Sequence, residues 1–297
     1  MFSGQGLQHG GTLGWLDDGK HTRLLRQHLG LDWRRQMADD SWVRRNAVAQ
    51  PLLTGLALGA WGQIGIDLPA PAVVAGYSVG ELAAFCVAGV FDAASAMQMA
   101  LQRAAAMDRS ASAMDTGLFA VSGLAASAVA TLCNSFALET AIDSGPGSVV
   151  LGGLRGSLQS AAEAARAQGG HVTPLRIDMA SHTRWIRNAA TEFGAALREH
   201  AFQQPTTHLV NNFNGQRVSD LDDARHALAN QIAHVLRWDD CMHTMAERGV
   251  CCVLEVGAGC ALARAWNSRY PDIPARAADE FRSAQAVRDW ILRHAAH

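Results

Sequence analysis

The hydrophobic and polar positions of this chain predict a series of helices that is broken by short extended runs. Residues 13–50 predict helices with arginine-rich exposed faces, and residues 47–66 form a small, apolar stretch that predicts a buried helix. The two prolines of segment 68–71 end this helix and lead into a β-branched run. Two further helices are predicted at 79–88 and 92–109, the second with Asp92 as its N-cap.

Residues 117–178 follow a different pattern. The predicted elements are a strand at 118–123, a helix at 125–136, strands at 137–142 and 149–152, a helix at 156–168 and a strand at 171–177. The order β-α-β-β-α-β is that of a ferredoxin-like unit. We therefore predict a small ferredoxin-like α+β subdomain at 116–179, inserted into a large α/β domain formed by 1–115 and 180–297.

The rest of the large domain returns to mixed helices and strands. The predicted elements are a helix at 184–200, a core strand at 207–212, helices at 222–236 and 238–248, and a strand at 252–256. The strand at 252–256 ends in Gly257-Ala258-Gly259. We discard this G-x-G as a dinucleotide loop, because it lies late in the chain and no acidic residue follows about twenty positions on.

The segment from Val73 to Phe85 contains the most informative motif. A β-branched run leads into Gly76-Tyr77-Ser78-Val79-Gly80, and good helix formers follow. Strand, sharp turn and helix around G-x-S-x-G predict a nucleophile elbow, in which the serine Oγ stands above the sheet. The backbone N–H of Val79 would then face an oxyanion from a helix N-terminus. The alternative is a surface turn that happens to contain a serine, and the flanking strand and helix favour the nucleophile.

Two further positions leave alternatives open. Gly4-Gln5-Gly6 is either a plain turn or a loop that presents the backbone N–H of Gln5 to a ligand. Arg103 lies among Met99, Leu101, Ala104 and Met107 on the predicted helix 92–109. An arginine in apolar company is paired, snorkels to solvent or waits for an anion, so a structural salt bridge and a ligand role both remain open.

The chain has twelve histidines, so choosing a general base is harder. His182 lies at a predicted strand-to-helix junction, where a base can reach a nucleophile on a neighbouring loop. By position alone it has several rivals, namely His171, His208, His226, His234 and His243.

Composition narrows the classes of function. A hydrophobic content of 49%, a charged content of 18% and a net charge of −2 are typical of a soluble globular protein and argue against nucleic acid as the main partner. No apolar run is long enough for a bilayer, and the N-terminus lacks the features of a signal peptide. The six scattered cysteines form no CxxC pair, so we expect free thiols in a cytoplasmic protein and no metal site.

A series of motifs makes a resemblance specific. The series comprises Gly4-Gln5-Gly6, Gly76-Tyr77-Ser78-Val79-Gly80-Glu81, Arg103, Ser181-His182, Gln231 followed by Trp238, and Glu255-Val256-Gly257-Ala258-Gly259. In this order they resemble, nearly end to end, the malonyl-CoA:acyl carrier protein transacylase family. The resemblance implies an α/β-hydrolase-like core with a mainly parallel sheet and an inserted ferredoxin-like subdomain. Tyr77, where fatty-acid-synthesis members usually have histidine, looks more like the epsilon subunit of malonate decarboxylase.

The resemblance implies roles for six residues. Ser78 matches the acyl-accepting nucleophile, His182 its base and Arg103 the arginine that binds the substrate carboxylate. The remaining three are the oxyanion donors Gln5 and Val79, through their backbone N–H groups, and Gln231, whose backbone carbonyl region steadies the histidine. No acidic third member is expected in this family.

The implied reaction moves a malonyl group from malonyl-CoA to the thiol of an acyl carrier protein through a malonyl-serine intermediate. The implied partners are the carrier protein, a coenzyme A thioester and other malonate decarboxylase subunits, with no nucleic acid and no membrane. Malonyl-CoA is a substrate, and no cofactor is expected. The alternatives are a fatty-acid or polyketide transacylase, a serine esterase or thioesterase, and a non-catalytic scaffold.

Three details affect these expectations. Only Met1-Phe2-Ser3 precede Gly4, where the family has a full strand, which predicts a weaker sheet edge and a less certain position for Gln5. Ser181 replaces a phenylalanine of many malonyl-selective domains and leaves room for an α-substituent. Arg184 and Arg187 either receive an acidic carrier protein or belong to a solvated helix face.

Overall fold

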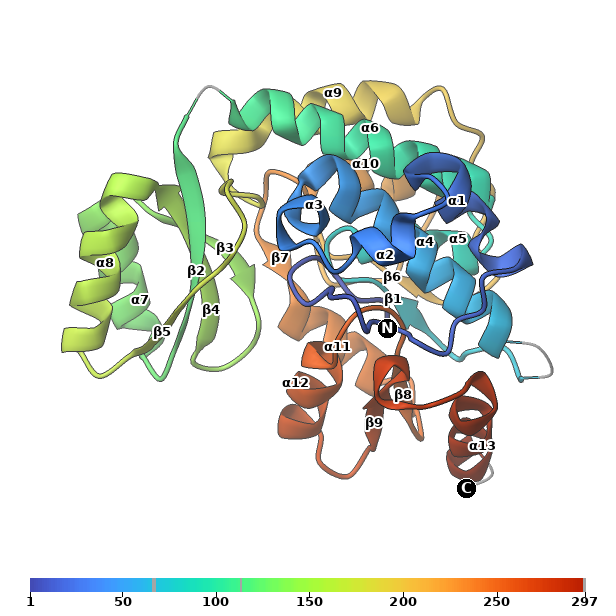
Figure 1. Ribbon diagram of the computed structural model, residues 1–297. Helices are drawn as coiled ribbons and strands as arrows, with labels where there is room; N and C mark the ends of the chain where they lie inside the picture. The colour runs from blue at the N-terminus through green and yellow to red at the C-terminus, as the bar shows by residue number, and fades with distance from the viewer. Residues whose placement is uncertain (66–67, 113, 296–297) are drawn as a thin grey trace.

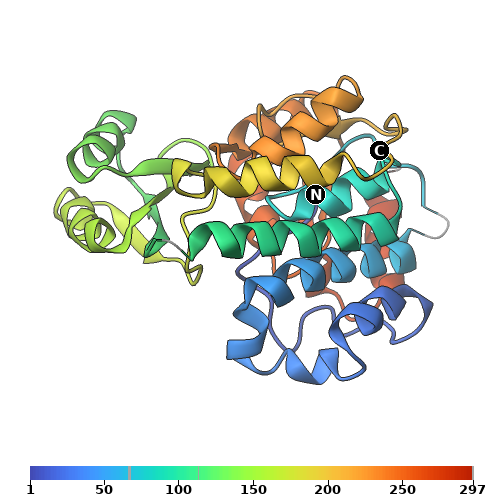
Figure 2. The ribbon, with the colours of Figure 1, turned by 90° about the horizontal axis from the view of Figure 1, so that it is seen from above.

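The computed structural model describes residues 1–65, 68–112 and 114–295. The predicted end of helix 47–66, together with residues 113 and 296–297 of the predicted large domain, lies outside the described residues. Figure 1 shows a larger lobe, which contains both ends of the described chain, and a smaller lobe coloured green to yellow-green. In Figure 2, helices α6 and α9 run side by side from the larger lobe toward the smaller one.

The larger lobe contains most of the helices. They are α1 (Arg23–Leu29), α2 (Trp33–Gln36), α3 (Asp40–Arg44), α4 (Asn46–Ile64), α5 (Gly80–Val87), α6 (Ala93–Ala111), α9 (Arg187–Leu197), α10 (Leu221–Asn230), α11 (Trp238–Ala246), α12 (Ala261–Arg269) and α13 (Ala284–Ala295), with short 3-10 helices at Lys20–Thr22, Arg184–Ile186 and Ala278–Glu280. Its strands are β1 (Val74–Ala75), β6 (Leu209–Val210), β8 (Val253–Glu255) and β9 (Ala275–Ala277).

The first residues of the chain join two parallel strand pairs. β1 pairs with β6 and β8 pairs with β9, and Phe2 bridges in parallel to both Gly76 and Val256. The backbone N–H of Phe2 donates to the Ala75 carbonyl at 2.9 Å, and that of Ser3 donates to the Val256 carbonyl at 3.1 Å. The start of the chain therefore lies between β1 and β8, and the expectation that its short length weakens the sheet stays a prediction.

The smaller lobe is a ferredoxin-like unit. It consists of β2 (Thr116–Ser122), α7 (Ala126–Phe136), β3 (Glu139–Asp143), β4 (Ser148–Leu154), α8 (Arg155–Ala167) and β5 (His171–Pro174). The strand order is β5-β2-β4-β3, with antiparallel neighbours, and β7 (Leu236–Arg237) adds in parallel beside β3. The structure confirms the α/β class with a ferredoxin-like subdomain. The domain boundaries stay a prediction, with the large domain at 1–115 and 180–297 and the small subdomain at 116–179.

Two helices predicted from the local pattern of apolar and capping residues are present in the structure. Helix α4 is apolar on all sides and is buried along nearly its whole length, which confirms the buried helix. Helix α6 begins after Asp92, whose carboxylate accepts a hydrogen bond from the Ser95 N–H at 2.7 Å, so the predicted N-cap is confirmed.

The predicted helix 222–236 is wrong at its end. Helix α10 stops at Asn230, and Leu236 pairs instead with Ile142 of the smaller lobe. Ile232, Ala233 and Leu236 are all buried, so the apolar spacing continues past the end of the helix and imitates one.

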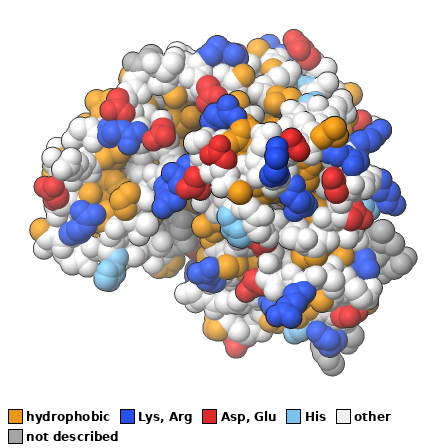
Figure 3. Space-filling view, in the orientation of Figure 1, with side chains coloured by type: hydrophobic (Ala, Val, Ile, Leu, Met, Phe, Trp, Pro, Cys, Tyr) orange, Lys and Arg blue, Asp and Glu red, His pale blue; other side chains and the backbone are white. Residues whose placement is uncertain are grey.

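On the face in Figure 3, basic and acidic side chains are interspersed over both lobes. Among the helices of residues 1–65, 68–112 and 114–295, none combines the length and the apolar character needed to cross a bilayer.

Candidate active site

Ser78 lies at the corner between β1 and α5, in the left-handed backbone region with φ of 55°. Any side chain at Gly76 would collide with the backbone of Gly80 and Glu81, and any side chain at Gly80 would collide with the backbone of Phe2. Both glycines of G-x-S-x-G are therefore required by close packing as well as by the turn. The strained serine matches the predicted nucleophile elbow.

Asn212, a residue that the sequence analysis did not select, holds this corner in place. Its side-chain oxygen accepts from the Ser78 N–H at 2.8 Å, and its amide nitrogen donates to the Gly76 carbonyl at 2.6 Å. The Asn212 N–H in turn donates to a carboxyl oxygen of Glu81 at 2.5 Å. The only sequence signal was the position of Asn211-Asn212 at the end of a predicted core strand.

Glu81 is fully buried, and burial raises the pKa of its carboxyl group to about 8. One carboxyl oxygen has no hydrogen-bond partner among the described residues. The hydrogen bond from Asn212 and the charge of Arg103 oppose the rise in pKa.

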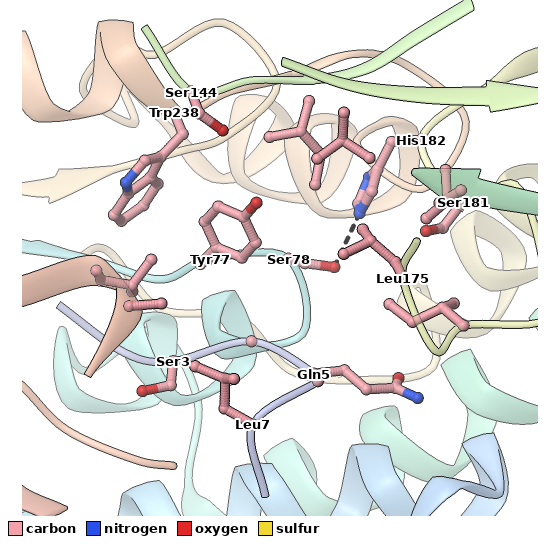
Figure 4. A pocket seen from close by; sticks show the side chains of 18 of the residues that line it. Ser3, Gln5, Leu7, Tyr77, Ser78, Ser144, Leu175, Ser181, His182 and Trp238 are labelled. Carbon is pink, nitrogen blue, oxygen red and sulfur yellow. Dashed lines mark hydrogen bonds between the residues drawn. The ribbon is translucent and has the colours of Figure 1, made fainter. Parts of the chain in front are cut away.

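His182 contacts the serine directly (Figure 4). Its Nε2 lies 2.9 Å from Ser78 Oγ, and its Nδ1 lies 2.6 Å from the backbone carbonyl of Gln231. A carbonyl only accepts, so Nδ1 carries the hydrogen and Nε2 is free to take the serine proton. Burial, and secondarily the charge of Arg103, lowers the pKa of His182 to about 3, which keeps the imidazole neutral at pH 7.

Arg103 is buried beside the same serine. One guanidinium nitrogen donates to Gln50 Oε1 at 2.8 Å, and the other lies 3.3 Å from Ser78 Oγ and 3.5 Å from Gln231 Oε1. Burial lowers the pKa of Arg103 to about 10, so the group stays charged at pH 7. Within the described part of the chain Arg103 makes no salt bridge, which leaves a buried cation facing the nucleophile.

The two predicted oxyanion donors come from different segments of the chain. Val79 immediately precedes the first residue of α5, and Gln5 lies on the N-terminal loop below the serine (Figure 4). A side chain at Gly4 would collide with Tyr77, so this glycine lets the loop approach the elbow. Neither the Gln5 nor the Val79 backbone N–H donates to another described residue, so both are available to a ligand.

These groups open into a cavity of about 660 Å³ between the two lobes. Arg103, Gln50 and Met107 form one part of its wall, and Tyr77, Trp238 and Ser144 form another. In Figure 4, Tyr77, Trp238 and Ser144 lie to one side of Ser78 and His182, and Ser181 lies beside the histidine. The cavity is much larger than a malonyl group, so it has room for part of the thioester carrier as well.

The rival histidines lie elsewhere. Of the residues that line this cavity, His182 is the only histidine, and His171, His208, His226, His234 and His243 are absent from its wall. Among the described residues, no three histidine, cysteine or acidic side chains gather in a way that could hold a metal ion. The six cysteines are free thiols. Of the candidate residues, Ser78, His182, Arg103 and Gln231 form one connected set of contacts, and Gln5 and Val79 flank it.

Comparisons with known proteins identify the family of this chain. Residues 34–291 match the acyl transferase domain family. The malonyl CoA-acyl carrier protein transacylase of Mycobacterium tuberculosis is 31% identical over 238 residues, which cover 79% of this chain and 78% of that protein. The Escherichia coli transacylase of the same name is 27% identical over 277 residues, 87% of this chain and 88% of that protein.

A solved structure extends the likeness to the whole fold. The crystal structure of FabD from Acinetobacter baumannii superposes with a TM-score of 0.89 at 26% identity and covers 98% of this chain and 97% of that one. The match to the family, the identity to the M. tuberculosis protein and the shared fold together show that this chain belongs to the acyl transferase domain family, among the malonyl CoA-acyl carrier protein transacylases.

Proposed function

We propose that the protein transfers a malonyl group from malonyl-CoA to the thiol of an acyl carrier protein, through an ester on Ser78. The observation that supports it best is the buried, unpaired Arg103 guanidinium within hydrogen-bond distance of a serine that already contacts a neutral histidine. The relatives named above are transacylases with this specificity.

In the first half of the reaction, Ser78 Oγ attacks the thioester carbonyl while its proton passes to Nε2 of His182. Negative charge collects on the former carbonyl oxygen, where the backbone N–H groups of Gln5 and Val79 stabilise it by a few kcal/mol. The carbonyl of Gln231 accepts from Nδ1–H and steadies the imidazolium. The imidazolium then protonates the departing coenzyme A thiolate, which leaves the malonyl ester on the serine.

The second half repeats these steps in reverse with another thiol. The carrier thiol gives its proton to His182 and attacks the ester carbonyl, and the proton returns to Ser78 Oγ as the new thioester leaves. Water must be excluded from the ester, because otherwise the enzyme releases malonate. The burial of His182 and Arg103 beside the serine serves this exclusion.

Arg103 provides the selectivity for a free carboxylate. A guanidinium binds a carboxylate through two parallel hydrogen bonds, while an acetyl group would leave the buried cation unpaired. Ser181 lines the cavity next to His182 and is small, which supports acceptance of α-substituted malonyl groups as well.

The transacylase could serve either fatty-acid or polyketide synthesis or malonate decarboxylation. The named relatives favour a fatty-acid or polyketide transacylase over a malonate decarboxylase subunit. Only Tyr77 supports the epsilon-subunit interpretation. Its ring is half-buried and packs edge-on against Trp238 at 5.2 Å between centroids, on the wall of the cavity. Comparing transfer to an ordinary phosphopantetheine carrier and to a malonate decarboxylase carrier separates the two pathways.

The docking surface for the carrier is part of the proposal. Arg184 is already engaged, since it forms a salt bridge with Glu139 at 2.6 Å and stacks on Trp185. Arg187 is exposed, and no described carboxylate pairs with it. Of the two predicted arginines, Arg187 is therefore the better candidate to receive an acidic carrier protein.

Incubation with malonyl-CoA followed by intact-mass measurement tests the proposal. We expect a malonyl adduct that forms on the wild type, is absent in Ser78→Ala, and moves to an added phosphopantetheine carrier. A non-catalytic scaffold gives no adduct, and an esterase gives free malonate with little carrier product. Either of those results would reject transacylation.

A further inference from the structure

A second pocket, of about 310 Å³, lies at the amino ends of β1 and β6, whereas Ser78 follows the carboxyl end of β1. It is lined by Ala70, Pro71, Ala72, Pro205, Thr206, Thr207, His208, Arg217 and Arg248. It shares no lining residue with the cavity at Ser78. The function proposed above therefore does not account for it.

The charged groups of this pocket are all basic. Arg217 and Arg248 are exposed, and neither forms a salt bridge within the described part of the chain. No described acidic residue lines the pocket. The two guanidinium groups therefore face a small polar recess without a visible counter-charge, which favours the entry of an anion.

His208 is the third basic side chain of the pocket. Its Nε2 is buried and has no hydrogen-bond partner among the described residues, which is unusual for a buried polar atom. Burial, and after it the charges of Arg248 and Arg217, lowers the pKa of His208. His208, Arg217 and Arg248 all line this pocket, so the three side chains face one small volume.

We propose that this pocket binds a small phosphate-type oxyanion between Arg217, Arg248 and His208. Arginine is suited to a tetrahedral oxyanion because its planar fork offers several donors, and a neutral imidazole adds one more. The volume admits a phosphate group with space left for a small organic remainder. Neutralising two neighbouring cations supplies the driving force.

The pocket is also connected to the strand that leads into the elbow. The His208 backbone carbonyl accepts a hydrogen bond from the Val74 N–H at 2.8 Å, and Val74 begins β1. A ligand bound beside His208 is therefore expected to stabilise the folded protein, by an amount that grows with the logarithm of one plus the ratio of its concentration to its dissociation constant.

The test uses the full chain with labelled histidines and a titration with inorganic phosphate, followed by NMR. We expect the pKa of His208 to rise as phosphate binds, because the anion cancels the field of both arginines. His171, which is exposed on β5, is the internal control and should not respond. Sodium chloride at matched ionic strength separates binding from general screening.

Variants make the test specific. Arg217→Ser and Arg248→Ser change exposed side chains, so folding is not at risk. Each is expected to weaken phosphate binding about tenfold, the effect of losing one charge-assisted hydrogen bond. Arg166→Ser, an exposed arginine on α8, is the matched control and should leave binding unchanged.

Three results would overturn the proposal: a His208 resonance that phosphate does not move, an equal shift with chloride, or binding that survives in the double variant. Glycerol phosphate is the second probe. If it competes with phosphate, the pocket accepts the phosphate group of organic esters; if it does not compete, the ligand is the free anion. Because malonyl transfer at Ser78 is measured separately, failure here does not affect the proposed activity.

Discussion

Replacing Arg103 with alanine gives the sharpest test of the site, because this residue alone distinguishes a malonyl transferase from a general serine hydrolase. The side chain is 1% exposed and lies 3.3 Å from the nucleophile. Its pKa of about 10 leaves it charged at neutral pH, so a bound malonyl carboxylate would complete a buried ion pair. Removing one partner of such a pair costs about 3–5 kcal/mol.

That cost predicts a fall in kcat/KM for malonyl-CoA of roughly 10²- to 10⁴-fold in Arg103→Ala. Acetyl transfer should be unchanged or faster, since the variant no longer leaves a buried charge unpaired. The serine and its base remain intact. Loss of the guanidinium also removes one cause of the low His182 pKa, so the histidine becomes a slightly stronger base.

The assay follows acyl-serine formation with malonyl-CoA and acetyl-CoA by rapid quench and mass measurement. Arg109→Ala is the matched control, because this arginine lies on the same helix but is exposed and pairs with Glu192. Arg103→Lys keeps the charge without the two-pronged geometry, and it should recover part of the malonyl activity. If Arg103→Ala keeps the wild-type preference for malonyl over acetyl, the carboxylate does not bind here and the reasoning fails.

The other predictions use different observables. Because burial holds the pKa of His182 near 3, a plot of acylation rate against pH should show no midpoint at 6.5 between about pH 5 and pH 8. The contribution of His182 to the free energy of unfolding is fully present above pH 6.5 and falls as the pH drops toward 3. A midpoint of the acylation rate at pH 6.5 would contradict this prediction. Because the pKa of Glu81 is raised, the free energy of unfolding should fall by up to about 1.4 kcal/mol per pH unit as the pH rises from 4.5 toward 8. Denaturant titrations of Glu81→Gln at several pH values should show that this slope is abolished. Asn212→Ala removes two hydrogen bonds at the elbow, so acylation should slow by about 10- to 100-fold and the Tm should fall. The control Asn214→Ala changes an exposed side chain and should alter neither the acylation rate nor the Tm. If both variants slow acylation equally, Asn212 does not position the serine. Ser181→Phe should reduce transfer of methylmalonyl more than that of malonyl in competition assays, and an unchanged ratio would show that position 181 does not limit acyl size.

Much of the fold could be predicted because local chemistry determines it. Asp92 before an apolar helix predicts an N-cap, and G-x-S-x-G between a strand and a helix predicts a tight corner, since these rules involve residues a few positions apart. The β-α-β-β-α-β order likewise predicts the ferredoxin-like sheet. The end of the helix after Asn230 could not be predicted, because the partner that draws Leu236 into a strand lies on β3, far back in the chain.

Some residues of the site could likewise be predicted from the sequence, and others could not. The motif singled out Ser78, but position alone left His182 as one histidine among several and left Arg103 between a salt bridge and a ligand role. The family resemblance favoured His182 as the base and Arg103 as the ligand-binding arginine. The contacts from Ser78 to His182 and Arg103 then showed that these groups meet. Asn212 was missed because nothing near it in the chain marks it, and its partners at Gly76 and Ser78 come from another strand.

By itself, the sequence determined where helices begin, where the chain must turn tightly and which family the motifs resemble, because propensity, capping and glycine geometry act over a few residues. Only the tertiary structure decided which histidine faces the serine, whether the buried arginine has a counter-charge, and that the first residues lie between two strand pairs. Those properties depend on distances between segments far apart in the chain, and they are set by how the two lobes and the parallel strands pack together.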